Sequence, residues 1–300
     1  MSDSRLGRIG AWGHLDSLDI AGARAYARRV DELGYAALWV PETAAREPFA
    51  LLAALAGETR RLVLGTSIVN IWGRDAQATR MGAMTLAEAT GGRFALGLGV
   101  SHPHLAEKLR GHHFERPLSH MRDYLAAYRS AVYRGPMPPD GTPEPPVLVA
   151  ALRERMTDLA ATDADGAFPY LVTAERVTWM RARLDAAAPD RRPLLAVTLP
   201  VVLAEADERD AARAYLAPYL RTPTYRASWE LQGFVADDWE APGSDRLVDA
   251  MVAIGDRTQV RARVDGLLAA GADHVAIIPI AADGTTEQLS TLEAMAGMIS

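Results

Sequence analysis

Three side chains capable of acid–base chemistry follow shortly after apolar stretches of the sequence. They are His14, Glu42 and His102. Histidine is well suited to exchange protons near neutral pH, and a carboxylate can do so when its surroundings shift its titration. Each residue also has a structural interpretation. Glu42, for example, follows Pro41 and is equally suited to capping the turn there.

A group of histidines follows Gly99. Its members are His102, His104, His112, His113 and His120. A metal site needs ligands that converge and a second shell that orients them, whereas loop histidines commonly serve as caps or surface residues. We therefore expect no metal here. His102 carries more weight than the others because it directly follows an apolar stretch.

Other chemistries are excluded by missing residues. The chain has no cysteine, which removes disulfides, thiolate nucleophiles, iron–sulfur clusters and cysteine-type zinc sites. Gly97-Leu98-Gly99 begins a dinucleotide-binding fingerprint, but its third glycine position is His102. No phosphate-binding Walker loop occurs, and Gly65–Val69 lacks the final glycine of a nucleophile elbow.

Charge and hydropathy favour a small-molecule partner. The net charge of −6 gives no general attraction to nucleic acid, and the basic residues are scattered. The first ten residues lack a hydrophobic signal core, and no apolar stretch approaches the length of a membrane-spanning helix. The expectation is a soluble, cytoplasmic protein without nucleic-acid or membrane partners.

Short apolar stretches alternate with amphipathic ones along the chain. Eight are expected to be strands: Arg8–Trp12, Ala36–Val40, Leu62–Ser67, Phe94–Gly99, Val147–Ala150, Gly166–Phe168, Leu194–Leu203 and His274–Pro279. Continuous apolar strands separated by helices predict a parallel sheet, and eight repeats within 300 residues favour closure into a (β/α)8 barrel. We expect residues 1–300 to form one domain.

The segment 221–245 interrupts this rhythm between the seventh and eighth expected strands. It places Tyr225, Trp229, Phe234 and Trp239 among proline, glycine and acidic residues. Such an insertion is compatible with a lid or substrate wall at the barrel mouth. It is equally compatible with a surface insertion that packs on its own aromatic side chains or on a second subunit.

In a barrel of this kind the chemistry lies at the carboxyl ends of the strands. Besides the three titratable residues, the positions there are Ser67, Ile68, Asn70 and Trp72; Val100 and Ser101; Ala151, Leu152 and Arg153; and Phe168 and Tyr170. The small residues Gly97, Gly99 and Ala150 suit a flat ring lying close to the backbone. Barrel packing also requires small residues at such positions.

The stretch LGTSIVNIWGRDAQATRMGAMTLAEATGGRFALGLGVSHP, from Leu64 to Pro103, resembles the core signature of luciferase-like flavin enzymes. Three further stretches resemble the family, and all occur along the chain in the family's order. They are ELGYAALWVPE at Glu32–Glu42, ATDADGAF at Ala161–Phe168 and GDRTQVRARVDGLLAAGADHVAIIP at Gly255–Pro279. The details RDYLAAYRS and SHPHL are most similar to the actinobacterial branch expected to use coenzyme F420, an 8-hydroxy-5-deazaflavin. The resemblance implies the luciferase-like form of the barrel and, by family habit, a homodimer.

The resemblance also implies where the cofactor lies. Family members carry a non-prolyl cis peptide behind the central ring, and the matching bond is Ser67–Ile68. Gly99, Val100 and Ser101 would pass along the ring edge, with Asn70 hydrogen-bonded to the ring. Ala150, Ala151, Leu152 and Arg153 would lie near the ribityl and phosphate groups, where helix N–H groups and an arginine suit an anion. Tyr170 is placed with these cofactor-binding residues.

The sequence departs from the deazaflavin-dependent sugar-phosphate dehydrogenases of the family. They have Asp-His where this chain has Pro41-Glu42, and an acidic residue near the position of His102. Sugar-phosphate oxidation is therefore disfavoured. We expect Glu42 and His102, with His14, to hold the substrate or to exchange a proton during hydride transfer, while the cofactor carries the redox chemistry.

The leading hypothesis is an F420-dependent oxidoreductase that transfers a hydride to or from a small organic substrate. A monooxygenase using reduced FMN and dioxygen is the main alternative, because both classes share the barrel and the ring pocket. A non-catalytic flavin-binding protein and a metal-dependent barrel hydrolase or lyase are the remaining alternatives. The substrate and the direction of the reaction are left open by the sequence.

Overall fold

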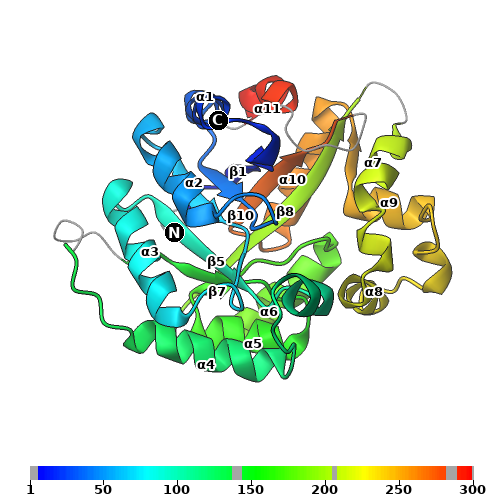
Figure 1. The fold of residues 1–300 in the computed structure, drawn as a ribbon. Coiled ribbons are helices and arrows are strands. Elements are labelled where there is room, and N and C mark those ends of the chain that lie inside the picture. The colour runs from blue at the N-terminus through cyan, green and yellow to red at the C-terminus, as the bar shows by residue number, and fades with distance from the viewer. Residues whose placement is uncertain (1–5, 137–143, 205–207, 282–288, 299–300) are drawn as a thin grey trace.

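Eight parallel strands close into a barrel in the computed structural model, which describes residues 6–136, 144–204, 208–281 and 289–298 (Figure 1). The barrel strands are β1 (Ile9–Trp12), β2 (Ala37–Val40), β3 (Val63–Thr66), β5 (Phe94–Gly99), β6 (Val147–Val149), β7 (Gly166–Ala167), β8 (Leu194–Leu203) and β10 (His274–Pro279). Each pairs with its neighbours in parallel, and β10 closes the ring between β8 and β1. The predicted (β/α)8 fold is confirmed.

Helices surround the barrel (Figure 1). They are α1 (Ile20–Glu32), α2 (Pro48–Leu55), α3 (Ala76–Ala89), α4 (Pro117–Ser130), α5 (Glu154–Asp163), α6 (Ala174–Ala187) and α10 (Arg257–Ala269). Aspartate caps define several of their starts, since Asp19, Asp75 and Asp256 each accept a hydrogen bond from a first-turn N–H group. An unpredicted C-terminal helix, α11 (Leu289–Met295), packs beside α1, where Tyr35 donates a hydrogen bond to the Leu292 carbonyl.

The barrel interior is filled by two large aromatic side chains, which are surrounded by aliphatic side chains, many of them alanine. Trp39 and Phe168 meet edge to face with centroids 4.6 Å apart, and both are buried. A Cβ on Gly65 would lie 2.4 Å from the Trp39 ring, so glycine is required on β3 opposite the indole. The interior is thus a packed core, and any ligand must bind above it at one end of the barrel.

A buried histidine joins the bottom of the barrel to this core. The Nε2 atom of His274 lies 2.9 Å from the indole nitrogen of Trp39, and its Nδ1 lies 2.9 Å from the Gly7 carbonyl oxygen. An indole N–H only donates and a carbonyl only accepts, so both contacts require neutral imidazole with its proton on Nδ1. Burial lowers the pKa of His274 to about 4.

This histidine should make the fold acid-sensitive. Unfolded histidine titrates near pH 6.5, so between that pH and about 4 the unfolded chain binds a proton that the folded chain refuses. We expect this group to remove about 1.4 kcal/mol of stability per pH unit on acidification through that window. Urea unfolding of the wild type and His274→Gln at pH 7, 5.5 and 4.5 measures the difference. Parallel pH dependence in the two proteins would contradict the assignment.

A helical flank, inserted in the sequence between β8 and α10, lies at one side of the barrel (Figure 1). It contains α7 (Arg209–Leu216), α8 (Pro223–Glu230) and α9 (Asp245–Met251), with short 3-10 turns at Tyr219–Arg221 and Ala236–Asp238. It ends in β9 (Ala253–Gly255), an unpredicted strand that pairs with Val201–Leu203 of β8. The segment 221–245 therefore contains α8 and a 3-10 turn joined by irregular backbone, and it forms only the middle of a longer insertion.

Among the residues that the structure describes, no helix is both long and apolar enough to cross a membrane.

Candidate functional site

A backbone bulge follows β3 at the barrel mouth. The Ser67–Ile68 peptide bond is cis, as the resemblance implies, and the chain then forms the short strand β4 (Val69–Asn70) against β5. Ile68 lies against the glycines of β5, because a Cβ on Gly99 would come within 2.4 Å of its Cδ1 atom. The Cβ atom of Ala150 lies 3.4 Å from the same position. The predicted cofactor-binding residues Ile68, Gly99 and Ala150 are thus neighbours.

Two glycines on β5 give a matched test of this platform. A Cβ on Gly97 would lie 2.1 Å from the Thr66 carbonyl oxygen, which is backbone, whereas Gly99→Ala would displace only the end of the Ile68 side chain. We expect Gly97→Ala to destabilise the fold by about 1–3 kcal/mol. Gly99→Ala should retain most stability but weaken cofactor binding at least tenfold. Urea unfolding and fluorescence titration separate the two effects, and unchanged cofactor affinity in Gly99→Ala would argue against a ring at this platform.

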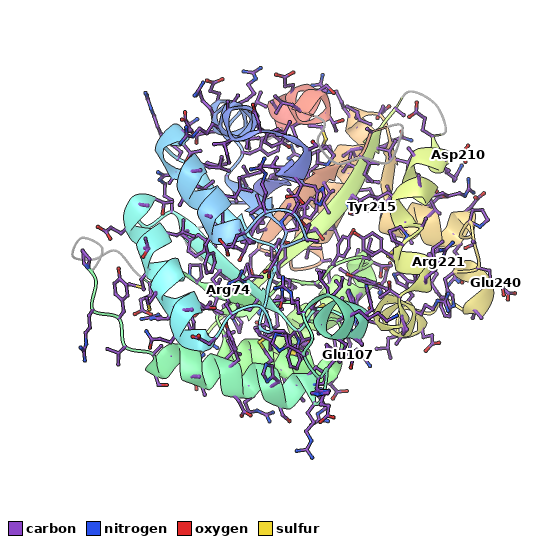
Figure 2. The ribbon with its side chains drawn as sticks, viewed as in Figure 1. Arg74, Glu107, Asp210, Tyr215, Arg221 and Glu240 are labelled. Carbon is purple, nitrogen blue, oxygen red and sulfur yellow. The ribbon has the colours of Figure 1, made fainter. Side chains whose placement is uncertain are left out.

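Glu42, at the end of β2, is held in a buried network. Its carboxylate accepts hydrogen bonds from the backbone N–H and the side-chain amide of Asn70, at 2.6 and 2.7 Å. It also accepts from Arg74 at 2.9 Å and from Arg110 at 3.0 Å, and its side chain is only 5 % exposed. Glu42 therefore ties β2 to the bulge and to the loop that follows β5. Figure 2 labels Arg74 near α3.

The chain beyond β5 is anchored by Trp72. The indole N–H of Trp72 donates to the Val100 carbonyl at 2.8 Å, and its ring stacks on His120 with centroids 4.2 Å apart. Ser101 follows with φ of 57°, in the left-handed region that is uncommon for residues other than glycine. Val100 and Ser101 are therefore fixed at the mouth, and they orient the residue that comes next.

That residue, His102, is largely buried and incompletely bonded. Its Nδ1 atom is buried and has no hydrogen-bond partner among the described residues. Its ring lies 5.9 Å from that of His104 and 5.5 Å from that of Tyr225, which comes from α8 in the flank. Burial, and then the charge of His104, lower the pKa of His102, so the ring is neutral at pH 7. A neutral imidazole is able to accept a proton.

Tyrosines from the flank pack beside His102. Tyr225 meets Tyr170 and Tyr219 edge to face, at 5.7 and 5.2 Å, and the hydroxyl of Tyr170 bonds that of Tyr215. Burial raises the pKa of each of these phenols, which keeps the hydroxyls protonated. Figure 2 labels Tyr215 on α7, beside β8. The flank therefore forms a wall at the barrel mouth as well as packing on its own aromatic residues, such as Trp229.

The remaining predicted residues lie around these groups. Ala151 is buried, Arg153 is an exposed N-terminal cap position of α5, and the Leu152 carbonyl accepts a hydrogen bond from Arg176. His14 is 39 % exposed, stacks on Trp12 and lies 3.2 Å from a carboxylate oxygen of Asp16. The same Asp16 oxygen accepts a hydrogen bond from Thr43, the residue after Glu42, so the contacts of His14 lead both to β1 and to the segment that carries Glu42.

Several residues of the site have no local signal in the sequence. Arg110 lies 68 residues from Glu42, and Tyr215 lies inside a stretch that indicates only a helix. Tyr225 is one of the aromatic residues noted in the insertion, but its contact with His102 has no counterpart in local spacing. Within the described ranges, no three His, Asp or Glu side chains converge as a metal site would require.

Comparison with known proteins now identifies the class. Residues 4–274 match the model of the luciferase-like monooxygenase family, and the chain belongs to that family. A Mycobacterium tuberculosis protein, provisionally named as a coenzyme F420-dependent oxidoreductase, is 27 % identical over 96 % of this chain and 97 % of its own.

Solved structures share the fold at low identity. An F420-dependent secondary alcohol dehydrogenase, in complex with an F420–acetone adduct, superposes with a TM-score of 0.76 at 12 % identity, covering 98 % of both chains. The oxygenating constituent of 3,6-diketocamphane monooxygenase from Pseudomonas putida, in complex with FMN, has a TM-score of 0.72 at 16 % identity, covering 98 % of this chain and 97 % of its own. Both kinds of cofactor are therefore bound by proteins of this fold.

Proposed function

We propose that this protein is an F420-dependent oxidoreductase that transfers a hydride between the coenzyme and a small organic substrate. One observation carries the proposal: the glycine-backed bulge at Ile68 lies at the same barrel mouth as a neutral, incompletely bonded histidine. The similarity to the mycobacterial relative over nearly the full length supports the deazaflavin as cofactor.

The residues at the mouth fit a flat ring with an anionic arm. Gly97 and Gly99 let the Ile68 bulge pack closely on β5, where it could back a flat ring, and the start of α5 near Arg153 offers backbone N–H groups to a phosphate. Ser67, Ile68, Asn70, Gly99, Val100, Ser101 and Tyr170 would surround the ring, and Ala150, Ala151, Leu152 and Arg153 its arm. When bound, the deazaflavin supplies the hydride acceptor or donor.

The protein's own part in substrate oxidation is proton transfer and positioning. His102, neutral at pH 7, would accept the hydroxyl proton of an alcohol substrate, and uptake of the hydride from its carbon, which gives the carbonyl product, is the chemistry that a bound deazaflavin would supply. In the reverse direction the protonated ring returns that proton. Tyr225 and Tyr170 bound the substrate on the flank side. His14 would contact the substrate from the β1 side.

Glu42 has a different role in this proposal. Its oxygens already accept bonds from Asn70 and two arginines, so it positions Asn70 against the ring and does not exchange a proton itself. The sequence alone predicts that Glu42, like the two histidines, holds the substrate or exchanges a proton. The proposal restricts Glu42 to positioning Asn70.

Side-by-side fluorescence titration of the purified protein with oxidised F420 and FMN tests the proposal. Micromolar binding of F420 and much weaker binding of FMN is the expected result, followed by anaerobic reduction of F420 with a panel of secondary alcohols. The opposite preference, with oxygen consumption, would instead identify a reduced-FMN monooxygenase, which the likeness to the FMN complex supports as the second candidate. Binding of neither would refute the ring site.

A further inference from the structure

Arg176 is a buried cation for which the described part of the chain provides no carboxylate. Its side chain is on α6, and the residue is only 7 % exposed. One guanidinium nitrogen donates to the Leu152 carbonyl at 2.6 Å, and the guanidinium carbon lies 3.8 Å from the ring centroid of Trp179. Its Nε atom is buried without a hydrogen-bond partner among the described residues. Buried charges are ordinarily paired, so this one requires an explanation.

The other arginines of the same helix show the usual arrangement. Arg181, 8 % exposed, pairs with Asp185 and with Asp273, and Arg183 pairs with Asp158. Helix α6 and its neighbours thus provide carboxylates for the arginines that only stabilise the fold. Arg176 departs from that pattern.

The position of Arg176 is also unfavourable for a cation. It is the third residue of a 14-residue helix whose start is capped by Thr173, so it lies at the positive end of the helix dipole. Burial lowers its pKa, which reflects the same unfavourable surroundings for its charge. A residue that violates several local preferences at once is expected at a binding site.

A cavity of about 680 Å³ lies in front of this side chain. Its volume falls in the range of small-molecule sites. It is lined by Arg176 and Trp179 of α6 and by Leu231 and Phe234 of the flank. Arg246 stacks over Phe234 at 4.5 Å. The first turns of both α5 and α6 border the cavity through Glu154 and Glu175. Glu154 is engaged by Arg183 at 2.7 Å, and Arg246 by Asp238.

We propose that this cavity binds an organic anion, a carboxylate or phosphate group carried on an apolar or flat body. Arg176 and the N–H groups at the helix starts receive the anionic group, while Trp179, Leu231 and Phe234 contact the body. The hydrogen bond from Arg176 to Leu152 connects the cavity with the proposed path of the coenzyme arm. The anion therefore has two possible sources, the acidic arm of the coenzyme or a free small acid. The proposal does not depend on hydride transfer.

Binding of 3-phenylpropanoate, measured by calorimetry on the full chain at fixed ionic strength, tests the site. The neutral isostere 3-phenylpropanol serves as the ligand control. We expect saturable binding of the acid, at least tenfold tighter than the alcohol. In Arg176→Gln the affinity for the acid should fall at least tenfold. Arg261→Gln, which removes an exposed arginine of α10, should bind like the wild type.

Stability measurements separate this role from a structural one. If Arg176 serves a ligand, Arg176→Gln should unfold at the same urea concentration as the wild type or a higher one, because an uncompensated buried charge has been removed. Equal binding of acid and alcohol by the wild type, or undiminished binding of the acid by Arg176→Gln, would overturn the proposal. Should Arg176→Gln fail to fold, Arg176→Lys provides the test, with weakened binding of the acid expected.

Coenzyme titrations then identify the source of the anion. A tenfold loss of F420 affinity in Arg176→Gln, with unchanged affinity for the phosphate-free ribityl deazaflavin, would assign the cavity to the coenzyme arm. Unchanged F420 affinity, with 3-phenylpropanoate binding to the coenzyme-saturated protein, would assign it to a free acid. If no coenzyme binds at all, the hydride-transfer proposal fails while the calorimetric test of the anion site still stands.

Discussion

Replacing His102 by glutamine is expected to lower turnover by about 10²- to 10⁴-fold, the usual contribution of a positioned acid–base group. Glutamine keeps a polar side chain of similar reach, but it has no nitrogen that accepts a proton. Because the Nδ1 atom of His102 has no bond to lose among the described residues, stability should change little. Steady-state rates with reduced or oxidised F420, together with urea unfolding, measure both quantities.

The pH profile distinguishes catalysis by His102 from a packing role. A base must be unprotonated, and burial lowers the pKa of this histidine below 6.5. Substrate oxidation by the wild type should therefore stay constant down to that lowered pKa and decline only below it. His102→Gln should lose this acidic limb. An unchanged profile at reduced rate would assign the proton transfer to another group. His113→Gln is the control, because His113 is an exposed histidine of the same loop and is not among the groups that shift the pKa of His102.

Glu42→Gln is expected to destabilise the fold by about 3 kcal/mol, because Arg74 and Arg110 lose a carboxylate that is 5 % exposed. The amide introduced at position 42 would also place an N–H donor against the two N–H donors of Asn70. Glu47→Gln is the matched control, since Glu47 pairs with the same Arg74 but is 48 % exposed. Its loss should amount to under about 1 kcal/mol. Equal losses in the two variants would show that burial of the network contributes nothing.

The same variant decides between two roles for Glu42. If Glu42 positions Asn70, cofactor affinity should fall together with turnover in Glu42→Gln, and the pH profile should keep the limb assigned to His102. If Glu42 exchanges a proton, affinity should persist while turnover and the pH profile change. Fluorescence titration and steady-state kinetics on one preparation give both readings.

The barrel could be predicted because its evidence is local. Every barrel strand coincides with a short apolar stretch, and aspartates mark the helix starts at positions 19, 75 and 256. The cis bond at Ser67–Ile68 followed from family resemblance, since apolar spacing carries no mark of it. Strand β9 was missed because three residues, Ala253–Gly255, are too few to form a pattern.

The chemistry of the site was less predictable because it depends on contacts between distant segments. The sequence placed Glu42 at a strand end, but its partner Arg110 belongs to a loop whose path follows from tertiary packing. The aromatic residues of 221–245 were visible, yet a lid and a surface insertion share the same composition. The contact of Tyr225 with His102 arises only when α8 folds back over the mouth.

Strand β8 has ten residues, more than the barrel needs, and its two halves serve different neighbours. Leu194 to Val201 pair with β7 and β10, whereas Val201 to Leu203 extend beyond the ring and pair with β9. A backbone bond from Ala204 to Gly255 holds the two ends of the flank together. The flank is consequently an insertion whose two ends lie side by side, so its length and sequence can change without altering the pairing of the barrel strands.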